Sequence, residues 1–358
     1  MLIYQPKAAL IPGKILANLL LKENISQKDL ALKTNLTEKH ISNIIQGKAS
    51  ITEDTAIKFE YVFGGKASFW INLQNNYDEN LARLAFEKNL IKELPLVKNF
   101  PFKELAAYNF VSKETKPVEK LKELLKFFGV SSLQQVEYAQ PVAYHQTAVK
   151  GKTIDQNAVA AWLRIGEIKY KELTGKKEIP EYNEGNFKKS FSEIKKLTRD
   201  DNFFNKLPEL LLKNGVILLD SPYLSKTYIS GAVRWIGSRP IIQINDHLKN
   251  KDGLFFTIFH EFAHIILHDK REEYIDYEGI KNERDIEKEA NDWACEILIS
   301  QSDYNKYLKQ NDISLKSISK FSKDLEINKD IIIGRLAYDG KISWTDRTKL
   351  VGKVKYCS

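Results

Sequence analysis

The strongest chemical signal in the sequence is the segment HEFAH at positions 260–264. On an α-helix, residues four apart lie on one face and about 6 Å apart along the axis, so His260 and His264 can both reach one ion. Zinc prefers such nitrogen ligands, and Glu261 would then lie beside the attacking water as its general base. Apolar residues flank the segment on both sides, as a buried active-site helix requires. The sequence therefore predicts a zinc site carried by a helix.

A third protein ligand must come from outside this segment. If the helix continues, His268 lies about 12 Å along the axis from His260, too far for a shared ion. We therefore expect His268 at the helix end, supporting a ligand. Glu287 is the better candidate, because Asn291 would share its helix face and could accept the spare N–H of a ligating histidine. Glu289 is the alternative, and a solvated acidic helix start is the interpretation that would hold without the HEFAH segment.

Three β-rich segments precede this helix and are expected to position it. They lie at 215–219, 228–235 and 240–244, and Gly237 joins the last two as a hairpin. An edge strand beside a zinc helix is where a peptide substrate can pair as an extra strand. Hydrolysis also requires a donor that stabilises the oxyanion. The candidates for this donor are Tyr228, Arg234 and Tyr274.

The N-terminal part, from Pro12 to Leu84, predicts a series of short helices. Ser26 begins one with a capping signature, and a second begins at a threonine cap and ends at Gly47. Spacing leaves two interpretations open: a helix-turn-helix, or a helical bundle whose polar residues are only solvated. In the first interpretation, the side chains near DNA are Gln27, Thr37, Glu38, Lys39, His40 and Asn43.

Composition excludes several classes of protein. With 358 residues, 43% of them hydrophobic, the chain is long enough for two or three folded domains. Two cysteines, Cys295 and Cys357, cannot form a disulfide framework. No signal-peptide core and no apolar run of about 18 residues is present, so we expect a cytoplasmic protein without membrane segments. The net charge of +8 suggests a nucleic-acid partner, but most of the excess lies in Lys-rich helices expected at 86–213.

Residues 10–80 resemble the HigA-type antitoxins, a branch of the lambda-repressor-like DNA-binding domains. The similarity includes the closing string FWINLQNNYD at positions 69–78. It implies a five-helix domain that binds operator DNA, and we expect a homodimer because a single helix-turn-helix binds its half-site weakly. Glu38, at the start of the recognition helix, repels phosphate but could accept a hydrogen bond from a cytosine amino group.

Residues 215–299 resemble the ImmA/IrrE family of metallopeptidases, in the strings ISGAVRW, SRPIIQIN, FFTIFHEFAHIILH and EKEANDWACEILIS. The family's zinc-binding pattern falls on His260, His264 and Glu287, with Glu261 as the base. Family members cleave repressors in stress or mobile-element responses. The resemblance therefore implies a transcription repressor or a partner antitoxin as the substrate.

Together these patterns predict a mainly α protein with a small antiparallel β-sheet (α+β). We expect a five-helix DNA-binding domain at 1–85, a helical connector at 86–200 and a zincin-like metallopeptidase domain at 201–358. The connector contains the string WLRIGE at 162–167, which resembles the connecting region of fused antitoxin–metallopeptidase proteins.

Three functions fit this organisation. The first is a DNA-binding regulator whose zinc endopeptidase domain cleaves a repressor or an antitoxin. The second is a non-catalytic antitoxin that represses its own operator and uses the C-terminal domain to bind a toxin or to sense a signal, since peptidase folds also serve as binding scaffolds. The third is a plain dimeric repressor, in which the C-terminal domain plays no part in operator binding.

Overall fold

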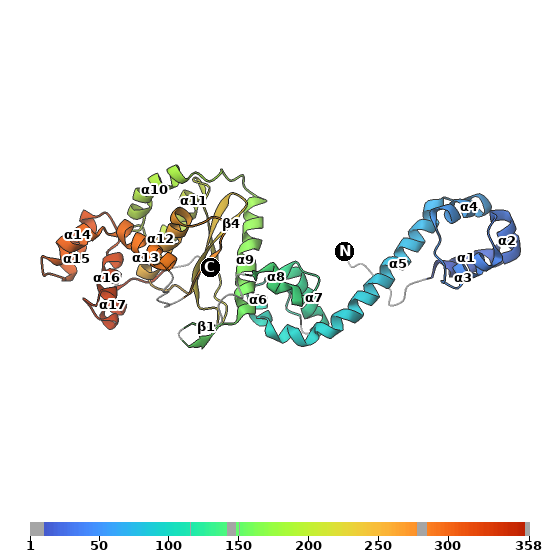
Figure 1. Ribbon diagram of the computed structural model, residues 1–358, viewed down its shortest axis with the longest axis horizontal. Helices are drawn as coiled ribbons and strands as arrows, with labels where there is room; N and C mark the ends of the chain where they lie inside the picture. Colours follow the sequence, from blue (N-terminus) through green and yellow to red (C-terminus); the bar gives the residue numbers. More distant parts are fainter. Residues whose placement is uncertain (1–10, 115, 142–147, 150, 278–284, 355–358) are drawn as a thin grey trace. The chain divides into compact units, whose positions relative to one another are not determined.

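The computed structural model describes residues 11–354 apart from 115, 142–147, 150 and 278–284 (Figure 1). Cys357 lies outside the described residues. The chain divides into two compact units, Met1–Leu94 and Pro95–Ser358. None of the helices in the described ranges is both long and apolar enough to cross a membrane.

The described part of the first unit contains five helices, as the resemblance implied. Their bounds are α1 (Pro12–Lys22), α2 (Gln27–Thr34), α3 (Glu38–Ile45), α4 (Glu53–Phe63) and α5 (Ala67–Leu90). Two expected caps are present. The Ser26 hydroxyl accepts a hydrogen bond from the N–H of Asp29 at 3.0 Å, and the Thr37 hydroxyl accepts one from the N–H of His40 at 3.1 Å. Each cap satisfies a backbone N–H that the first helical turn leaves unpaired.

The string at 69–78 closes the core of the first unit. Trp70 is buried against the ring of Phe59, with ring centroids 5.1 Å apart. The Gln74 side chain accepts the N–H of Ile51 at 3.0 Å. These contacts hold α5 against α4 and against the loop before α4. Residues 69–78 therefore stabilise the fold of this unit.

The second unit is a mixed α/β structure in which helices surround a sheet (Figure 1). Its elements, with η1 leading into it, are η1 (Ile91–Asn99), α6 (Phe102–Ala107), α7 (Pro117–Phe128), η2 (Leu133–Gln135), α8 (Val136–Ala139), β1 (Ala148–Val149), β2 (Lys152–Thr153), α9 (Gln156–Thr174), α10 (Glu184–Leu197), α11 (Phe203–Leu212), β3 (Ile217–Ser221), β4 (Ile229–Ile236), β5 (Arg239–Asn245), α12 (Lys251–Leu267), β6 (Tyr274–Tyr277), α13 (Asp285–Leu298), α14 (Gln301–Leu308), α15 (Leu315–Asp324), α16 (Lys329–Tyr338) and α17 (Trp344–Leu350).

The main sheet has the strand order β3-β5-β4-β6. β4 and β5 form the expected antiparallel hairpin, and β6 pairs antiparallel with β4. β3 runs parallel to β5, so the sheet is mixed, and the expectation of a purely antiparallel sheet is wrong for this pair. The pattern of apolar residues along a strand indicates which faces are buried and carries no information about strand direction.

Helices cover both faces of this sheet. On one face, α12 packs against Val233 of β4 and Ile242 of β5, in a core that α10 and α11 also enter. On the other face lies α9, whose Trp162 is fully buried. Because successive strand residues point to opposite faces, Val233 faces α12 and Arg234 faces α9.

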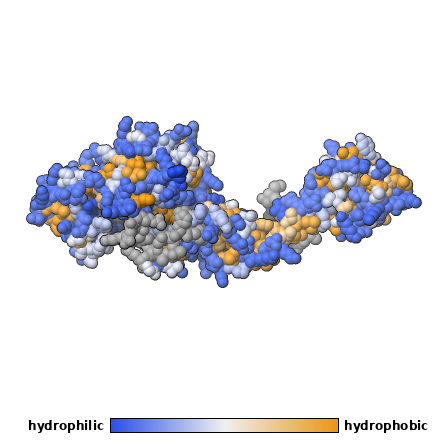
Figure 2. Space-filling view, viewed as in Figure 1, coloured by the Kyte–Doolittle hydropathy of each residue, from blue (hydrophilic) through white to orange (hydrophobic). Residues whose placement is uncertain are grey.

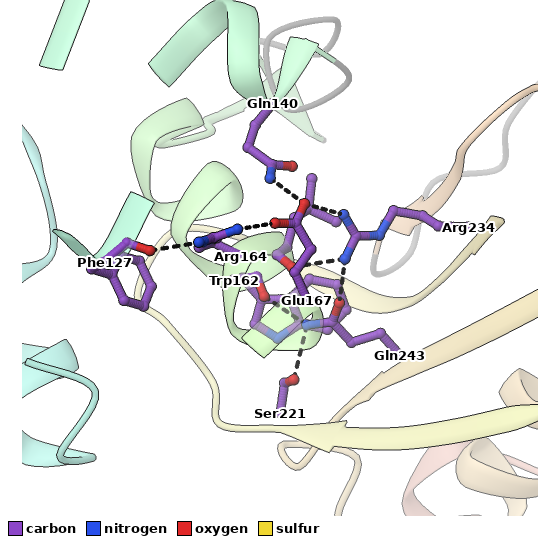
Figure 3. A network of polar contacts seen from close by, with 9 residues as sticks. Phe127, Gln140, Trp162, Arg164, Glu167, Ser221, Arg234 and Gln243 are labelled. Carbon is purple, nitrogen blue, oxygen red and sulfur yellow. Dashed lines mark hydrogen bonds and ion pairs between the residues drawn. The ribbon is translucent and has the colours of Figure 1, made fainter. Parts of the chain in front are cut away.

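Figure 3 shows the polar network that joins α9 to the sheet. The Glu167 carboxylate accepts hydrogen bonds from three side chains, those of Gln140, Arg164 and Arg234. The Arg234 guanidinium also donates to the carbonyl of Leu163 at 2.7 Å, and the Gln243 amide donates to the carbonyl of Trp162 at 2.6 Å. The WLRIGE string therefore supplies partners for polar side chains buried on the far face of the sheet.

This network ties α9 to the sheet by hydrogen bonds. The sequence suggested a boundary near 200; we propose that the domain begins no later than α9. A fragment 201–358 would leave Arg234 and Gln243 without their α9 partners and would expose the apolar residues on that face of the sheet. It would also lose the packing of Trp162, a change of about 3–5 kcal/mol, which is a large part of a domain's whole stability.

We therefore expect a fragment of residues 95–358 to unfold cooperatively on heating, as followed by circular dichroism. A fragment of residues 201–358 should show no cooperative transition, because it lacks both α9 and α10 and exposes the apolar surfaces that these two helices cover. A cooperative transition in the shorter fragment, at the temperature of the longer one, would contradict this boundary.

Candidate metal centre

His260 and His264 lie in the middle of α12. Both side chains are almost completely buried, and their Nε2 atoms are 3.0 Å apart. Glu287, in the first turn of α13, brings one carboxylate oxygen to 3.2 Å from His260 Nε2 and to 3.6 Å from His264 Nε2. One ligand atom from each of the three residues lies within 4.8 Å of the others, a spacing that fits a single metal ion. The structure thus brings together the three residues that the sequence suggested as ligands.

Asn291 orients the first histidine. It lies one turn after Glu287 on α13, and its Oδ1 is 3.0 Å from His260 Nδ1. A carboxamide oxygen only accepts hydrogen bonds, so Nδ1 carries a hydrogen and Nε2 is the ring nitrogen that faces the cluster. This arrangement of a ligand carboxylate and a supporting amide on one helix face is common around histidine ligands.

His264 is held from two sides. His268 ends α12 as its C-terminal cap residue, and its Nδ1 is 2.8 Å from His264 Nδ1. The other ring nitrogen of His268 lies 3.4 Å from the carboxylate of Glu289, whose side chain is 61% exposed. The ring of Tyr274 from β6 stacks on His264 with centroids 4.6 Å apart. Glu289, the alternative ligand, thus contacts His268 rather than the cluster.

Carboxylates place the two histidines in a negative field. Burial lowers the pKa of His260, but its hydrogen bond with Glu287 and the charges of Asp276 and Glu261 outweigh burial and raise this pKa to about 9. Burial lowers the pKa of His264 to about 4. Burial raises the pKa of Glu287, yet hydrogen bonds from both histidines prevail and lower it to about 2. A cluster that draws a proton onto one of its own histidines has the field that attracts a divalent cation.

Glu261 lies fully buried beside the cluster. Neither of its carboxylate oxygens has a hydrogen-bond partner among the described residues, and burial raises its pKa well above the usual value. An unpaired buried carboxylate is costly unless water or a ligand meets it. The adjacent backbone is that of Gly231 in β4, where a Cβ would overlap Glu261 Oε1. Sequence reasoning did not single out Gly231, although a glycine inside a strand signals a close approach.

The three residues considered as oxyanion donors lie in different places. Tyr274 adjoins the cluster, but its hydroxyl donates to the carbonyl of Asp269 at 3.2 Å. The ring of Tyr228 lies under the ammonium group of Lys152. Arg234 points away from the cluster into the α9 network, because even-numbered residues of this part of β4 face α9. Arg234 is therefore excluded as a donor at this site.

The residues suggested for DNA contact lie on two neighbouring helices of the first unit. Exposed on α2, α3 and the turn between them are Gln27, Thr37, Glu38 and Lys39, whereas His40 and Asn43 are half-buried. The opposite face of α3 buries Ile41 and Ile44 in the core. A short helix with a polar outer face, held against a preceding helix, is the arrangement of a helix-turn-helix.

Comparison with known proteins identifies relatives of the first unit. The chain is 36% identical over 75 residues to Virulence-associated protein I of Dichelobacter nodosus, across 21% of this chain and 69% of that protein. It is 34% identical over 64 residues to an uncharacterized HTH-type transcriptional regulator, YddM, of Escherichia coli strain K12, across 18% and 68%. A solved addiction module antidote protein of the HigA family from Coxiella burnetii is 33% identical, across 24% of this chain and 95% of that chain, with a TM-score of 0.22.

Family models match both parts of the chain. A helix-turn-helix model matches residues 16–70, from α1 into α5. The model of the IrrE N-terminal-like domain matches residues 219–336, which include the whole cluster and Glu261. The chain therefore belongs to the XRE-type helix-turn-helix regulators and carries, fused to that domain, a domain of the ImmA/IrrE metallopeptidase family.

Proposed function

We propose that this chain is a cytoplasmic DNA-binding regulator whose C-terminal domain is a zinc-dependent endopeptidase. The substrate would be a transcription repressor or an antitoxin, cleaved in a stress or toxin–antitoxin response. The observation that carries this proposal is the buried cluster of His260, His264 and Glu287 beside Glu261. Two imidazoles and one carboxylate are a donor set that zinc takes in catalytic sites, where a fourth position stays open to the reactants.

Glu261 is the proposed general base. Its buried carboxylate, which has no hydrogen-bond partner in the part of the chain that the structure describes, has a raised pKa. A raised pKa suits a group that takes a proton from the attacking water and delivers it to the leaving amine. Zinc, when bound, supplies a Lewis acid that polarises the peptide carbonyl. Asn291 and His268 hold the two histidine rings through their Nδ1 atoms, so that both Nε2 atoms stay directed at the cluster.

The first unit is proposed to bind operator DNA through α2 and α3. Gln27 and Thr37 would contact the phosphate backbone, where helix starts and polar side chains set the position on the duplex. Lys39, His40 and Asn43 would reach base edges in the major groove, together with Glu38. Support comes from the exposure of Gln27, Thr37, Glu38 and Lys39, from the half-exposed positions of His40 and Asn43 beside them, and from the helix-turn-helix family match.

A homodimer would let two such units meet the two halves of an operator. Leu81 and Leu84 of α5, and Ile91 just beyond it, are 44%, 44% and 56% exposed and lie on one helix face. Apolar surface is visible along this helix in Figure 2. An exposed apolar stripe on a long helix is typical of a helix–helix interface, and we propose that it pairs with the same stripe of a second copy.

A second candidate function is a non-catalytic antitoxin that represses its own operator. In this case the C-terminal domain binds a toxin or senses a signal. One observation favours this alternative: the three ligand candidates and Glu261 are all more than nine-tenths buried, which closes the cluster to a protein substrate in this conformation.

Substitutions at three glutamates separate these functions. Glu261→Gln should retain zinc but slow cleavage by about 10²–10⁴-fold, because an amide cannot take up the proton. Glu287→Ala should lose both zinc and cleavage, and Glu209→Gln, at an exposed position on α11, is the matched control that keeps both. Zinc is measured by elemental analysis after dialysis, and cleavage by electrophoresis of the repressor, antitoxin or toxin encoded beside this chain. A wild type that never cleaves, while Glu261→Gln neutralises a toxin stoichiometrically, would support the antitoxin instead.

Lys39→Ala should weaken binding to the DNA upstream of the chain's own gene. Removing one cationic contact should also reduce the slope of log affinity against log salt by about one. Fluorescence anisotropy at several salt concentrations measures both effects, with Lys14→Ala, exposed on α1, as the control. If the two variants show the same affinity and slope, α3 is not the recognition helix.

Charges in the α5 stripe should separate the proposed dimer. Leu81→Lys combined with Leu84→Lys places like charges at an interface that would otherwise bury apolar surface, so the chain should sediment as a monomer and bind its operator more weakly. Phe86→Lys is the control, because Phe86 is equally exposed but lies on another face of α5. A dimer that survives the double substitution would place the interface elsewhere.

A further inference from the structure

β6 occupies the edge of the sheet beside the cluster. It pairs antiparallel with β4, with Tyr274 opposite Val233 and Asp276 opposite Gly231. Val233 and Gly231 face α12, so Tyr274 and Asp276 project to the same side of the sheet. Tyr274 accordingly stacks on His264. β6 thus lies beside the cluster, on the side of β4 that faces away from β5.

An extended peptide that paired with β4 would lie in the same place. A strand has two edges, and β4 uses one of them for β5 and the other for β6. β4 is also the strand nearest to the proposed base, because the backbone of Gly231 touches the Glu261 carboxylate. The backbone position beside Gly231, where a scissile bond would reach this carboxylate, is held by Asp276 of β6.

With β6 paired to β4, the site is closed. His260, His264 and Glu261 are 2%, 1% and 0% exposed, and Glu287 is 7% exposed. A peptide bond must come within hydrogen-bond reach of the general base through one water at most. Side chains this deeply buried do not admit a polypeptide, so catalysis on a protein requires an element beside the cluster to move.

β6 is the element with the weakest hold on the sheet. It is four residues long, it has one neighbouring strand, and its ladder with β4 contains a register shift between Ile229 and Gly231. The Tyr277 hydroxyl is buried without a hydrogen-bond partner in the described part of the chain, which further reduces the gain from docking. Short edge strands with one neighbour are among the segments that open locally before a domain unfolds.

We propose that β6 is an internal occupant of the substrate position, and that a peptide pairs with β4 only after β6 has left it. This inference rests on the proposed peptidase function, since it concerns access to the same site. The substrate class it names is a polypeptide segment that can adopt an extended strand. The opposite arrangement, with β6 as a fixed wall and the substrate beyond it, is the outcome that would overturn the proposal.

A reversible cross-link tests whether β6 must move. Ala232 and Ile275 are paired across β4 and β6, and paired residues of adjacent strands lie within the Cα separation that a disulfide spans. The chain carries Ala232→Cys and Ile275→Cys in a background in which Cys295 and Cys357 are serine. Oxidation then locks β6 to β4, and reduction releases it.

A second cross-link serves as the matched control. Ile236→Cys and Arg239→Cys, in the same background, join β4 to β5 at the end of the hairpin and leave β6 free. A third variant, Ile275→Pro, acts in the opposite direction, because proline in an edge strand removes an N–H and weakens pairing.

Two measurements are made on the full-length chain. The first is the affinity of the zinc-loaded protein for a peptide hydroxamate, which must enter the site to bind. The second is hydrogen exchange of the β4 and β6 amides without added metal. We expect oxidation of the β4–β6 cross-link to lower hydroxamate affinity and to slow β6 exchange by about tenfold or more, with no change for the β4–β5 cross-link. Ile275→Pro should raise both the hydroxamate affinity and the exchange rate of the β6 amides.

Equal hydroxamate affinity in the oxidised and reduced forms would overturn the proposal. The proposal would also be overturned if the β6 amides of the reduced chain exchanged only when the whole domain unfolds. This exchange measurement tests whether β6 opens by itself, even if no form of the protein binds the hydroxamate. A chain that shows both expected effects but cleaves no protein would keep this inference and refute the proposed peptidase function.

Discussion

The packing of α12 against α13 is the interaction on which the chemistry of the C-terminal domain depends. One helix carries two imidazoles and the other a carboxylate, and all three groups are buried where water cannot separate them. Removing one partner from such a set strands a charge in a low-dielectric interior, at a cost of about 3–5 kcal/mol. The buried charges of the cluster must therefore be balanced together, either by a proton that its residues share or by a bound cation.

This constraint explains how the surrounding elements are built. The sheet supplies an apolar wall for α12, and α9 closes the far side of the sheet with hydrogen bonds to Arg234 and Gln243. α12 itself carries two of the candidate ligands, whereas α9 carries none. Between them, the two helices keep both faces of β4 and β5 dry, so that the distances in the cluster are set by close packing rather than by flexible side chains.

Short sequence patterns predicted those features of the structure that depend on residues close together in the chain. The histidine pair follows from helical periodicity, the caps at Ser26 and Thr37 from helix-start preferences, and Glu287 from its four-residue spacing to Asn291. The parallel direction of β3, the strand β6 and the docking of α9 depend on contacts between distant segments. No pattern within a short window reports such contacts, which is also why Arg234 was placed near the site although it faces the opposite layer.

The glycine at position 231 has a consequence that reaches beyond the backbone of β4. Its missing side chain is the space in which the carboxylate of Glu261 sits, so a strand residue and a helix residue share one volume. A methyl group at this strand position would displace the Glu261 carboxylate. Among related chains, the residue at this position should thus separate domains that have room for a buried carboxylate at this point of the helix from domains that do not.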